Sequence, residues 1–336
     1  MSLQEPAATT IDTAGRATVA APPPIARRPA PPAGVAGAVL ARPQRTLWGE
    51  AWRRFRRHQL GMLGLVVLIA FVVLGVGAPV LAPYQQEAQN LANQFAGPSP
   101  AHWLGTDELG RDVFTRVLYA ARITLFVTTV STLLGTIFGV VVGAAAGFFG
   151  GWVETILMRL TDVMLSLPVL ILLLVVSKML REMAFLRNTF GTNNVSVVVI
   201  IIILTLFGWM GLARLVHGSV LSLKQREFVE AARTLGARPW RIIAQHLLPN
   251  SVAPIIVQTT LRFGTAVVLE GTLSFLGLGI SPPNASLGNM LTGAQGFMFR
   301  NPMLAVYPGM VIFFVVLAIN FVGDALRDAL DPRMSL

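Results

Sequence analysis

Residues 226–241 read Arg-Glu-Phe-Val-Glu-Ala-Ala-Arg-Thr-Leu-Gly-Ala-Arg-Pro-Trp-Arg, and the chain continues to Leu-Leu-Pro-Asn at 247–250. This stretch is a polar, basic island between two long apolar regions. Apolar residues recur in it at the spacing of one helix face: Phe228, Ala231, Ala232 and Leu235. Gly236 stands where a left-handed C-cap would fall, Pro239 suits the start of a second helix, and Pro249 should end that helix. The stretch predicts a helix–glycine–helix finger with an apolar face and a charged rim.

A finger of this kind, on the cytoplasmic side of a membrane, suits docking into a groove of another protein. The alternative is an ordinary solvated loop between membrane spans, whose basic residues only set the topology.

Composition indicates a polytopic membrane protein. The chain has 336 residues, of which 54% are hydrophobic and 12% charged, whereas soluble domains carry about a quarter charged residues. Cysteine is absent, which excludes disulfides, thiolate metal sites and cysteine nucleophiles. The net charge of +10 comes mainly from arginines beside apolar runs and in the N-terminal region, so membrane orientation explains it better than nucleic-acid binding does.

Apolar runs and their flanking charges predict an all-α protein with six transmembrane helices. The residues before 47 are rich in Ala, Pro and Thr and have no periodic apolar face, which is typical of disorder. The first charge-free run is long enough to span about 30 Å of hydrocarbon. Most Lys and Arg residues fall on the side of the two termini, which places both termini in the cytoplasm.

The predicted parts, in order, are a disordered cytoplasmic tail at 1–46, a basic interfacial collar at 47–59, a first span at 60–82, an external loop at 83–122 that ends in a short lead-in helix over 111–122, a core with five further spans at 123–330 that contains the finger at 226–250, and a cytoplasmic C-terminus at 331–336.

Two spans carry local features. The second span has a glycine at every fourth residue, which allows close helix packing: Gly135, Gly139, Gly143 and Gly147. In the third span, Arg159 and Asp162 lie three residues apart on one helix face and predict a structural ion pair near the cytoplasmic interface. Pro168 should kink this span.

The fifth span contains two deeply placed charges, Arg262 and Glu270. At about 1.5 Å rise per residue they lie roughly 12 Å apart along the axis, so they do not pair with each other. Charges inside a membrane usually face a cavity or a partner. Both residues are therefore candidates for the translocation path, and a structural pair with another helix remains the alternative.

The external loop contains Asp107, Glu108 and Asp112 near His102. A metal site is one interpretation. Carboxylates without a second histidine have no dedicated ligand spacing here, so a packed, hydrogen-bonded loop is favoured and no metal is expected.

The sequence lacks the motifs of nucleotide hydrolysis and of common catalytic sites. No G-x-x-x-x-G-K-[ST] and no H-E-x-x-H occur, and the four histidines are dispersed. No catalytic residue is expected, and any hydrolysis that powers the protein must occur on a partner.

Four segments together resemble one family of transporters. The order Glu230-Ala231-Ala232, Gly236, Leu247-Leu248-Pro249 is similar to the EAA loop of the membrane subunits of ABC importers. Leu-Gly-Thr-Asp with Gly-Arg-Asp at 104–112, Glu-Gly-Thr-Leu-Ser-Phe-Leu-Gly-Leu-Gly-Ile-Ser-Pro-Pro at 270–283, and the segment 324–333 resemble the dipeptide, oligopeptide and nickel branch. Within that branch the chain resembles the C-type permease subunit.

The resemblance implies a type I permease fold with a cytoplasmic coupling helix that docks on an ATPase. The implied docking residues are Glu227, Glu230, Ala231, Ala232, Leu235 and Gly236. The implied external signature consists of Gly105, Thr106, Asp107, Gly110, Arg111 and Asp112.

The resemblance also implies partners and a location. The partners are a homologous B-type permease, two ATPase subunits or domains that hold ATP and Mg, an external substrate-binding protein and the lipid bilayer. The location is the bacterial plasma membrane, and the cargo is a dipeptide or oligopeptide, or else a nickel chelate, glutathione or an oligosaccharide. Outside this class stand a secondary transporter acting alone and a membrane receptor or scaffold; only the importer requires an ATPase that co-purifies.

Overall fold

The computed structural model describes residues 10–11, 17–18 and 47–331. The chain divides into two units, Met1–Thr46 and Leu47–Leu336. In the first unit, strands β1 (Thr10–Ile11) and β2 (Ala17–Thr18) pair antiparallel. The remainder of the tail predicted to be disordered, and the C-terminus beyond residue 331, lie outside the described residues.

The second unit is built from helices. Its elements are α2 (Leu47–Arg57), α3 (Gln59–Val76), α4 (Ala78–Leu81), the 3₁₀ turn η1 (Leu91–Asn93), α5 (Val113–Phe149), α6 (Gly151–Ser166), α7 (Val169–Glu182), α8 (Ala184–Gly208), α9 (Met210–Leu223), α10 (Glu227–Thr234), α11 (Pro239–Ile242), the π-helical segment η2 (Ile243–Leu247), α12 (Leu248–Asn250), α13 (Val252–Phe275), α14 (Leu287–Gln295) and α15 (Met303–Leu330). Within the described ranges, five helical segments are long and apolar enough to cross a membrane, and α6 with α7 makes a sixth if that bent pair is one span. The predominantly helical fold is therefore confirmed, and its five or six candidate spans agree with the six that were predicted.

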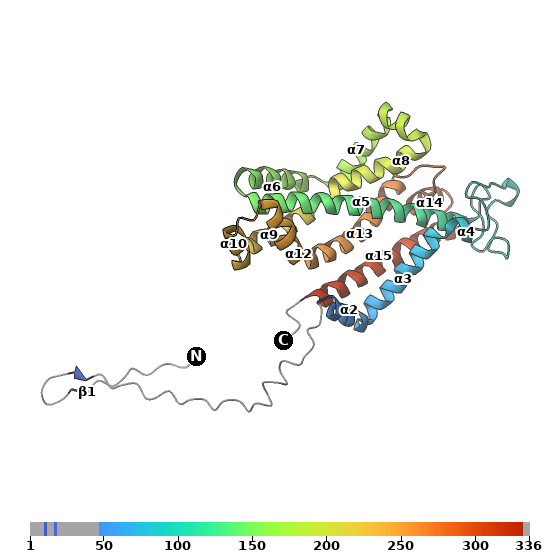
Figure 1. Cartoon of the computed structure of the whole chain (residues 1–336). Helices are drawn as coiled ribbons and strands as arrows, with labels where there is room; N and C mark the ends of the chain where they lie inside the picture. The colour runs from blue at the N-terminus through green and yellow to red at the C-terminus, as the bar shows by residue number, and fades with distance from the viewer. Residues whose placement is uncertain (1–9, 12–16, 19–46, 332–336) are drawn as a thin grey trace, which may run out of the picture. The chain divides into compact units, whose positions relative to one another are not determined.

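Helix α5 runs through the second unit, and α9, α8, α3 and α13 pack along it (Figure 1). Three glycines of the predicted stripe, Gly139, Gly143 and Gly147, face α9. A Cβ atom at Gly143 would lie 2.4 Å from the carbonyl oxygen of Ala213, and one at Gly147 would lie 2.9 Å from the Cβ of Val220. Only residues without a side chain allow the two backbones to approach this closely.

Helix α5 begins earlier than the sequence pattern predicted. A lead-in helix over 111–122 and a separate span from residue 123 were expected, whereas the structure has one continuous helix from Val113. The side chain of Asp112 caps this helix by accepting a hydrogen bond from the Thr115 amide at 2.8 Å. The predicted boundary at residue 122 is wrong, and the external loop ends at the cap.

Pro168 separates α6 from α7, and the two helices meet at 95°. Leu167 and Pro168 both have extended backbone conformations. A proline lacks the amide that a helix needs and disfavours helical geometry in the preceding residue. The predicted kink is confirmed, and it amounts to a complete break in the helix.

The first span packs against the last one. Helix α3 lies beside α15, where a Cβ at Gly61 would be 2.3 Å from the Cβ of Ala325 and one at Gly64 would be 2.6 Å from the carbonyl oxygen of Ala318. Helix α3 ends at Val76, so the predicted span over 60–82 is divided between α3 and the short α4.

Candidate functional site

The finger forms at the predicted place. Helix α10 ends in a Schellman motif: the Ala237 amide donates to the carbonyl of Ala232 at 3.0 Å, and the Gly236 amide donates to that of Arg233 at 2.9 Å. Gly236 has a φ of 77°, which favours glycine. Pro239 then begins α11. The predicted turn and the predicted start of the second helix are both confirmed.

The second helical segment of the finger continues past Pro249. It runs through η2 and α12 to Asn250, and the chain turns at Ser251. A proline ring clashes with the carbonyl four residues earlier, and the widened π-helical turn displaces that carbonyl. The helix therefore ends one residue after Pro249, which agrees with the predicted end to within one residue.

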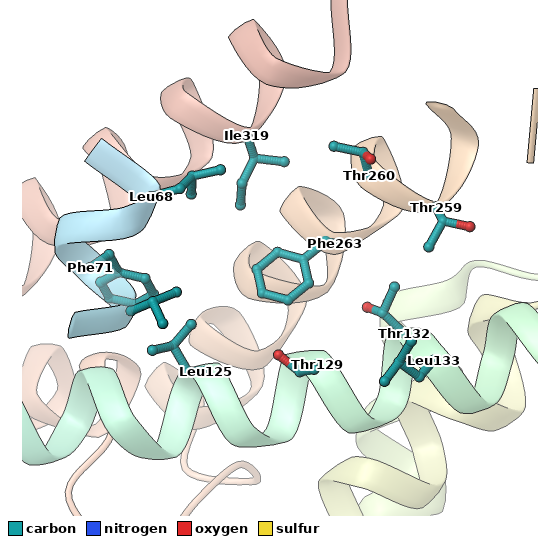
Figure 2. A pocket seen from close by; sticks show the side chains of 11 residues that line it. Leu68, Phe71, Leu125, Thr129, Thr132, Leu133, Thr259, Thr260, Phe263 and Ile319 are labelled. Atoms are coloured by element: carbon teal, nitrogen blue, oxygen red, sulfur yellow. The ribbon is translucent and has the colours of Figure 1, made fainter. Parts of the chain in front are cut away.

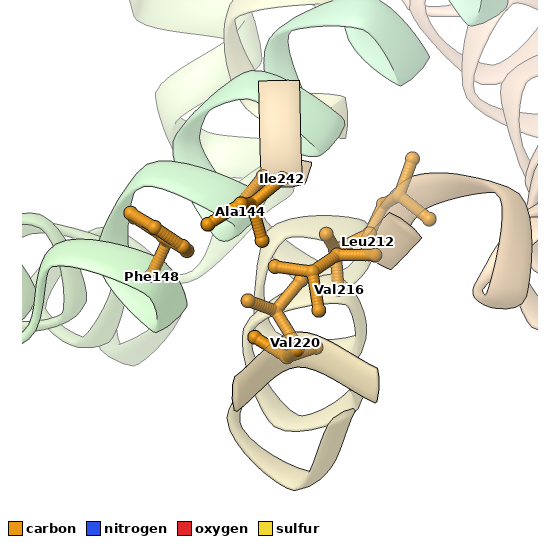
Figure 3. Packing of buried hydrophobic residues seen from close by; sticks show 8 residues of the cluster. Ala144, Phe148, Leu212, Val216, Val220 and Ile242 are labelled. Carbon is orange, nitrogen blue, oxygen red and sulfur yellow. The ribbon is translucent and has the colours of Figure 1, made fainter. Parts of the chain in front are cut away.

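One side of the finger is buried against the transmembrane helices. Val229 of α10, Ile242 of α11 and Leu247 of η2 are inaccessible or nearly so. They belong to one buried cluster with Val216 and Val220 of α9 and with Ala144 and Phe148 at the end of α5. Figure 3 shows this cluster, with Ile242 labelled for the finger. The buried side chains attach the finger firmly to α5 and α9.

The other side of the finger is exposed and apolar. Leu235 is 88% exposed, Trp240 is 72% exposed and Phe228 is 41% exposed. With neighbouring residues they line a groove of about 850 Å³, whose other lining residues are Ala231, Ala232, Gly236, Ala237, Arg238, Arg241, Gln245 and His246. An exposed apolar surface of this kind marks a site of interaction.

The implied docking residues lie on or beside this groove. Ala231, Leu235 and Gly236 line it and are exposed, while Ala232 lines it and also packs inward on the buried cluster. Glu227 and Glu230 are exposed in the first turn of α10. Their carboxylates suit the positive end of the helix dipole.

Contacts from the end of α9 and from the finger reach the end of α5. Lys224 donates to the carbonyl oxygen of Phe148 at 2.5 Å, and the guanidinium of Arg233 lies over the Phe148 ring at 5.6 Å. His217 Nε2 and Glu154 Oε1 are 2.8 Å apart and join α9 to α6. Sequence reasoning missed these residues, since no local spacing signals partners that lie 76 residues apart.

Asp162 pairs with a different arginine from the one predicted. Its Oδ1 accepts a hydrogen bond from Arg214 of α9 at 2.5 Å, with both side chains about half exposed. Arg159 is exposed and, among the described residues, forms no ion pair. The predicted Arg159–Asp162 pair is wrong, because the contact between α6 and α9 offers Asp162 a partner from another helix.

Arg262 lines a cavity of about 420 Å³. The cavity lies where the break between α6 and α7 faces the junction of α8 with α9 and one side of α13. Gln258 and Thr265, on the same helix as Arg262, are its other side chains with polar groups. The role of Arg262 in the translocation path stays a prediction.

Glu270 does not line an open path in this structure. Its side chain is fully buried, and its two carboxylate oxygens accept hydrogen bonds from Thr124 at 2.9 Å and Ser274 at 2.8 Å. Within the described part of the chain it has no cationic partner. Because Glu270 is buried between α5 and α13, the structure corrects the hypothesis that it lines the path. Because two hydroxyl groups donate to its carboxylate, the structure also corrects the hypothesis of an ion pair with another helix.

The external signature is a hydrogen-bonded loop. The carboxylate of Asp107 accepts from the guanidinium groups of Arg111 at 2.7 Å and Arg116 at 2.5 Å, and Asp112 bonds His102 Nδ1 at 2.9 Å. Gly105 and Gly110 have positive φ values, and Thr106 forms a β-bridge with Asp112. No group of residues in the described ranges could hold a metal ion. The loop is organised by its own hydrogen bonds.

A second cavity, of about 300 Å³, lies between α3, α5, α13 and α15. Figure 2 shows that its walls are leucine, phenylalanine and isoleucine side chains with a few threonines, among them Thr129, Thr132 and Thr259. No charged side chain lines it, so its chemistry is that of the lipid interior.

A helical membrane protein with a finger that presents an apolar groove has the architecture of a permease of the ABC transporter class. Residues 139–336 match the family described as the binding-protein-dependent transport system inner membrane component, and residues 46–98 match the N-terminal TM domain of oligopeptide transport permease C. The chain belongs to this family of permeases. It is a multi-pass membrane permease and not itself an ATPase.

Similar proteins include named transport permeases. The dipeptide transport system permease protein DppC of Bacillus subtilis (strain 168) is 41% identical over 88% of this chain and 88% of its own length. The DppC of Alkalihalophilus pseudofirmus is 38% identical over 85% of this chain and 90% of its own length. The glutathione transport system permease protein GsiD of Escherichia coli O157:H7 is 41% identical over 86% of this chain and 92% of its own length.

Among solved structures, an inward-facing conformation of the MetNI methionine ABC transporter is similar. Its TM-score is 0.50 at 24% identity, and the match covers 64% of this chain and 96% of that chain. This likeness concerns the fold and agrees with the type I permease architecture.

Proposed function

We propose that the chain is one of two permease subunits of an ATP-driven importer for dipeptides or oligopeptides. The names of the DppC relatives support this substrate class. The finger with its exposed groove is the observation that supports energy coupling. Glutathione, itself a small peptide with free carboxylates, is the second candidate cargo, because a glutathione permease is as similar as the DppC relatives are.

Energy enters this permease from another protein. The sequence has no phosphate-binding loop, so ATP and Mg bind on two ATPase subunits or domains. Leu235, Trp240 and Phe228 are free to insert into a groove of the ATPase, while Val229 and Ile242 hold the finger on the transmembrane helices. A docked partner that moves therefore moves α5 and α9.

The remaining partners follow from the architecture of such importers. A homologous B-type permease supplies the other half of the path, and an external substrate-binding protein delivers the cargo. The chain lies in the bacterial plasma membrane with both termini and the finger in the cytoplasm. The loop between α4 and α5 lies at the opposite end of α5 from the finger (Figure 1), which agrees with a loop outside the cell.

Transport proceeds by alternating access in this proposal. When ATP closes the ATPase dimer, the ATPase groove draws α10 with it. The contacts of Lys224 and Arg233 with Phe148 transmit the displacement to α5. Interfaces of packed helices change by discrete rearrangement rather than continuous bending, so the path opens to the other side.

Site-directed photocrosslinking tests the docking. The chain contains no cysteine, so a Leu235→Cys variant carries one unique thiol for a benzophenone label in membranes of the native host. We expect the label to capture an ATPase that carries a phosphate-binding loop, and purified ATPase to compete with the capture.

The matched control is Trp103→Cys, which is also exposed, at 62%, but lies in the external loop. It should capture no ATPase and should react with a membrane-impermeant thiol reagent in intact cells. The proposal fails if the Leu235 position captures no nucleotide-hydrolysing protein or reacts from outside. Peptide flux in liposomes that contain this chain alone would favour a secondary transporter instead.

A further inference from the structure

Arg262 lies close to mid-depth in its transmembrane helix. It follows the first residue of α13, Val252, by ten positions, which corresponds to roughly 15 Å of helix, or half of a hydrocarbon layer of about 30 Å. A charge at such a depth is costly and is normally retained with a partner or for a function.

The structure makes room for the guanidinium of Arg262. It lies against Gly135 of α5 and Gly208 of α8, where an added Cβ would be 1.9 Å and 2.1 Å from its NH2 atom. A side chain at either position would displace the guanidinium from its present place. The two glycines therefore leave the space that the guanidinium occupies in this structure.

This guanidinium has unused hydrogen-bonding capacity. Its NH1 atom is buried without a hydrogen-bond partner, and no ion pair to Arg262 is found among residues 47–331. A buried donor without a partner is destabilising. The NH1 donor is therefore used by no group in the described part of the chain.

The adjoining cavity fits a small anionic group. Its volume of about 420 Å³ lies in the range of small-molecule sites. Gln258 and Thr265 lie on the same face of α13, one turn to either side of Arg262. The other lining side chains are apolar, and no acidic residue is among them. The cavity therefore offers one positive charge with no built-in counter-ion.

We propose that Arg262 binds a carboxylate of the peptide cargo, above all its C-terminal carboxylate, as the peptide passes the middle of the membrane. The inference rests on the proposed import of peptides and adds the chemical group that this site recognises. A guanidinium matches a carboxylate with two parallel hydrogen bonds. Gln258 lies next to the bound carboxylate, and the apolar walls accept varied side chains.

The test compares two cargoes that differ in one group. The complete importer, with its ATPases and binding protein, is reconstituted in proteoliposomes, and uptake of labelled Ala-Ala is measured against Ala-Ala amide. The binding protein is the same throughout, so a change in the acid-to-amide uptake ratio between permease variants reports on the permease. We expect Arg262→Gln to lower this ratio at least about tenfold, with little change in amide uptake.

Three further variants make the test specific. Arg262→Lys keeps the positive charge but cannot donate two parallel hydrogen bonds as the planar guanidinium does. It should retain part of the preference for Ala-Ala over Ala-Ala amide. Gln258→Glu places a carboxylate one turn before Arg262, where it pairs with the guanidinium and should abolish the preference even if Arg262→Gln fails to assemble. Arg159→Gln removes an exposed arginine of α6 and should leave the ratio unchanged.

The outcomes separate the two proposals. If the wild-type importer carries neither dipeptide, and also carries no labelled oligopeptide or glutathione, the proposed function itself is overturned. If it carries peptides but the acid-to-amide ratio is the same in wild type, Arg262→Gln and Gln258→Glu, peptide import stands and the carboxylate site is overturned. If Arg262→Gln fails to assemble the complex and Gln258→Glu keeps the wild-type ratio, the carboxylate site is likewise overturned and Arg262 is assigned to pairing with the partner permease.

Discussion

Asp107 lies in the loop before α5. Its carboxylate accepts hydrogen bonds from two guanidinium groups and two backbone amides. It bonds Arg111 and Arg116 through their side chains and accepts from the amides of Leu109 and Arg111 at 2.9 Å. The Asp107 side chain is 3% exposed, and those of the arginines are 16% and 12% exposed. Removal of one member of such a buried cluster leaves the others uncompensated.

Asp107→Ala should therefore lower the free energy of unfolding by about 3 kcal/mol or more, because two guanidinium groups lose their shared counter-ion. The midpoint of thermal unfolding in detergent measures this loss. Glu108→Ala is the control: Glu108 also bonds Arg111, at 2.9 Å, but is more exposed, so the expected loss is below ~1 kcal/mol. Equal losses in the two variants would contradict the assigned role of Asp107.

Glu270 is a buried carboxylate bound only by hydroxyl groups in the described structure. A glutamine has the same shape, can accept from one hydroxyl and can donate to the other. Because no positive charge compensates an ionised form, Glu270→Gln should be neutral or stabilising in thermal unfolding, with peptide uptake within about twofold of wild type. A tenfold loss of uptake with unchanged stability would instead return Glu270 to the path.

At the scale of elements, the finger depends on one backbone conformation. Gly236 has a positive φ, and a Cβ there would meet no atom within 4 Å, so a substitution acts through the backbone alone. Gly236→Val should shift α10 relative to α11, because β-branched residues avoid this region. We expect ATP hydrolysis by the assembled importer to continue while peptide uptake falls several-fold.

Gly236→Asn provides the matched control, because asparagine tolerates the left-handed conformation. Its ratio of uptake to ATP hydrolysis should remain close to that of wild type. Wild-type coupling in Gly236→Val would show that the turn does not position the docking helix.

The sequence predicts an element correctly where a single residue determines the backbone conformation at its own position. Gly236, Pro239 and Pro168 act through their own backbone, so their turn, helix start and break could be predicted from sequence. The sequence does not show that α5 is one helix, because charged residues near its start resemble the boundary of a membrane span. In the structure the Arg116 guanidinium finds Asp107 in the loop, and Asp112 caps the helix.

Tertiary partners could not be predicted in the same way. The i, i+3 spacing suggested Arg159 for Asp162, but the contact between α6 and α9 brings Arg214, which is 52 residues away. Periodicity found the apolar face of α10 and yet did not show that Val229, outside that face, is the residue buried on the membrane helices. Such choices depend on how helices distant in sequence pack.

At the scale of the whole membrane unit, α5 connects the two ends where partners are proposed to bind. Its 37 residues extend over roughly 55 Å. At its first turn it continues the external loop through Asp112, and at its last turn Phe148 meets Lys224 at the end of α9 and Arg233 of the finger. One continuous helix thus links the side where we propose the ATPase to the side where we propose the binding protein.

The first span is attached to the rest of the membrane unit through small residues. Gly64 of α3 faces the backbone of α15, where a side chain would meet the carbonyl oxygen of Ala318 at 2.6 Å and the Cβ of Phe321 at 3.1 Å. Gly64→Val should separate α3 from α15 and lower the free energy of unfolding by about 1–3 kcal/mol, measured as the midpoint of thermal unfolding in detergent. Leu63→Val, at a position 55% exposed on the outer side of the same helix, should change it by less than ~0.5 kcal/mol.

Because residues 139–336 match the permease family without α3, the Gly64→Val protein should still bind the ATPase. Loss of ATPase binding at unchanged unfolding temperature would show instead that the first span takes part in coupling.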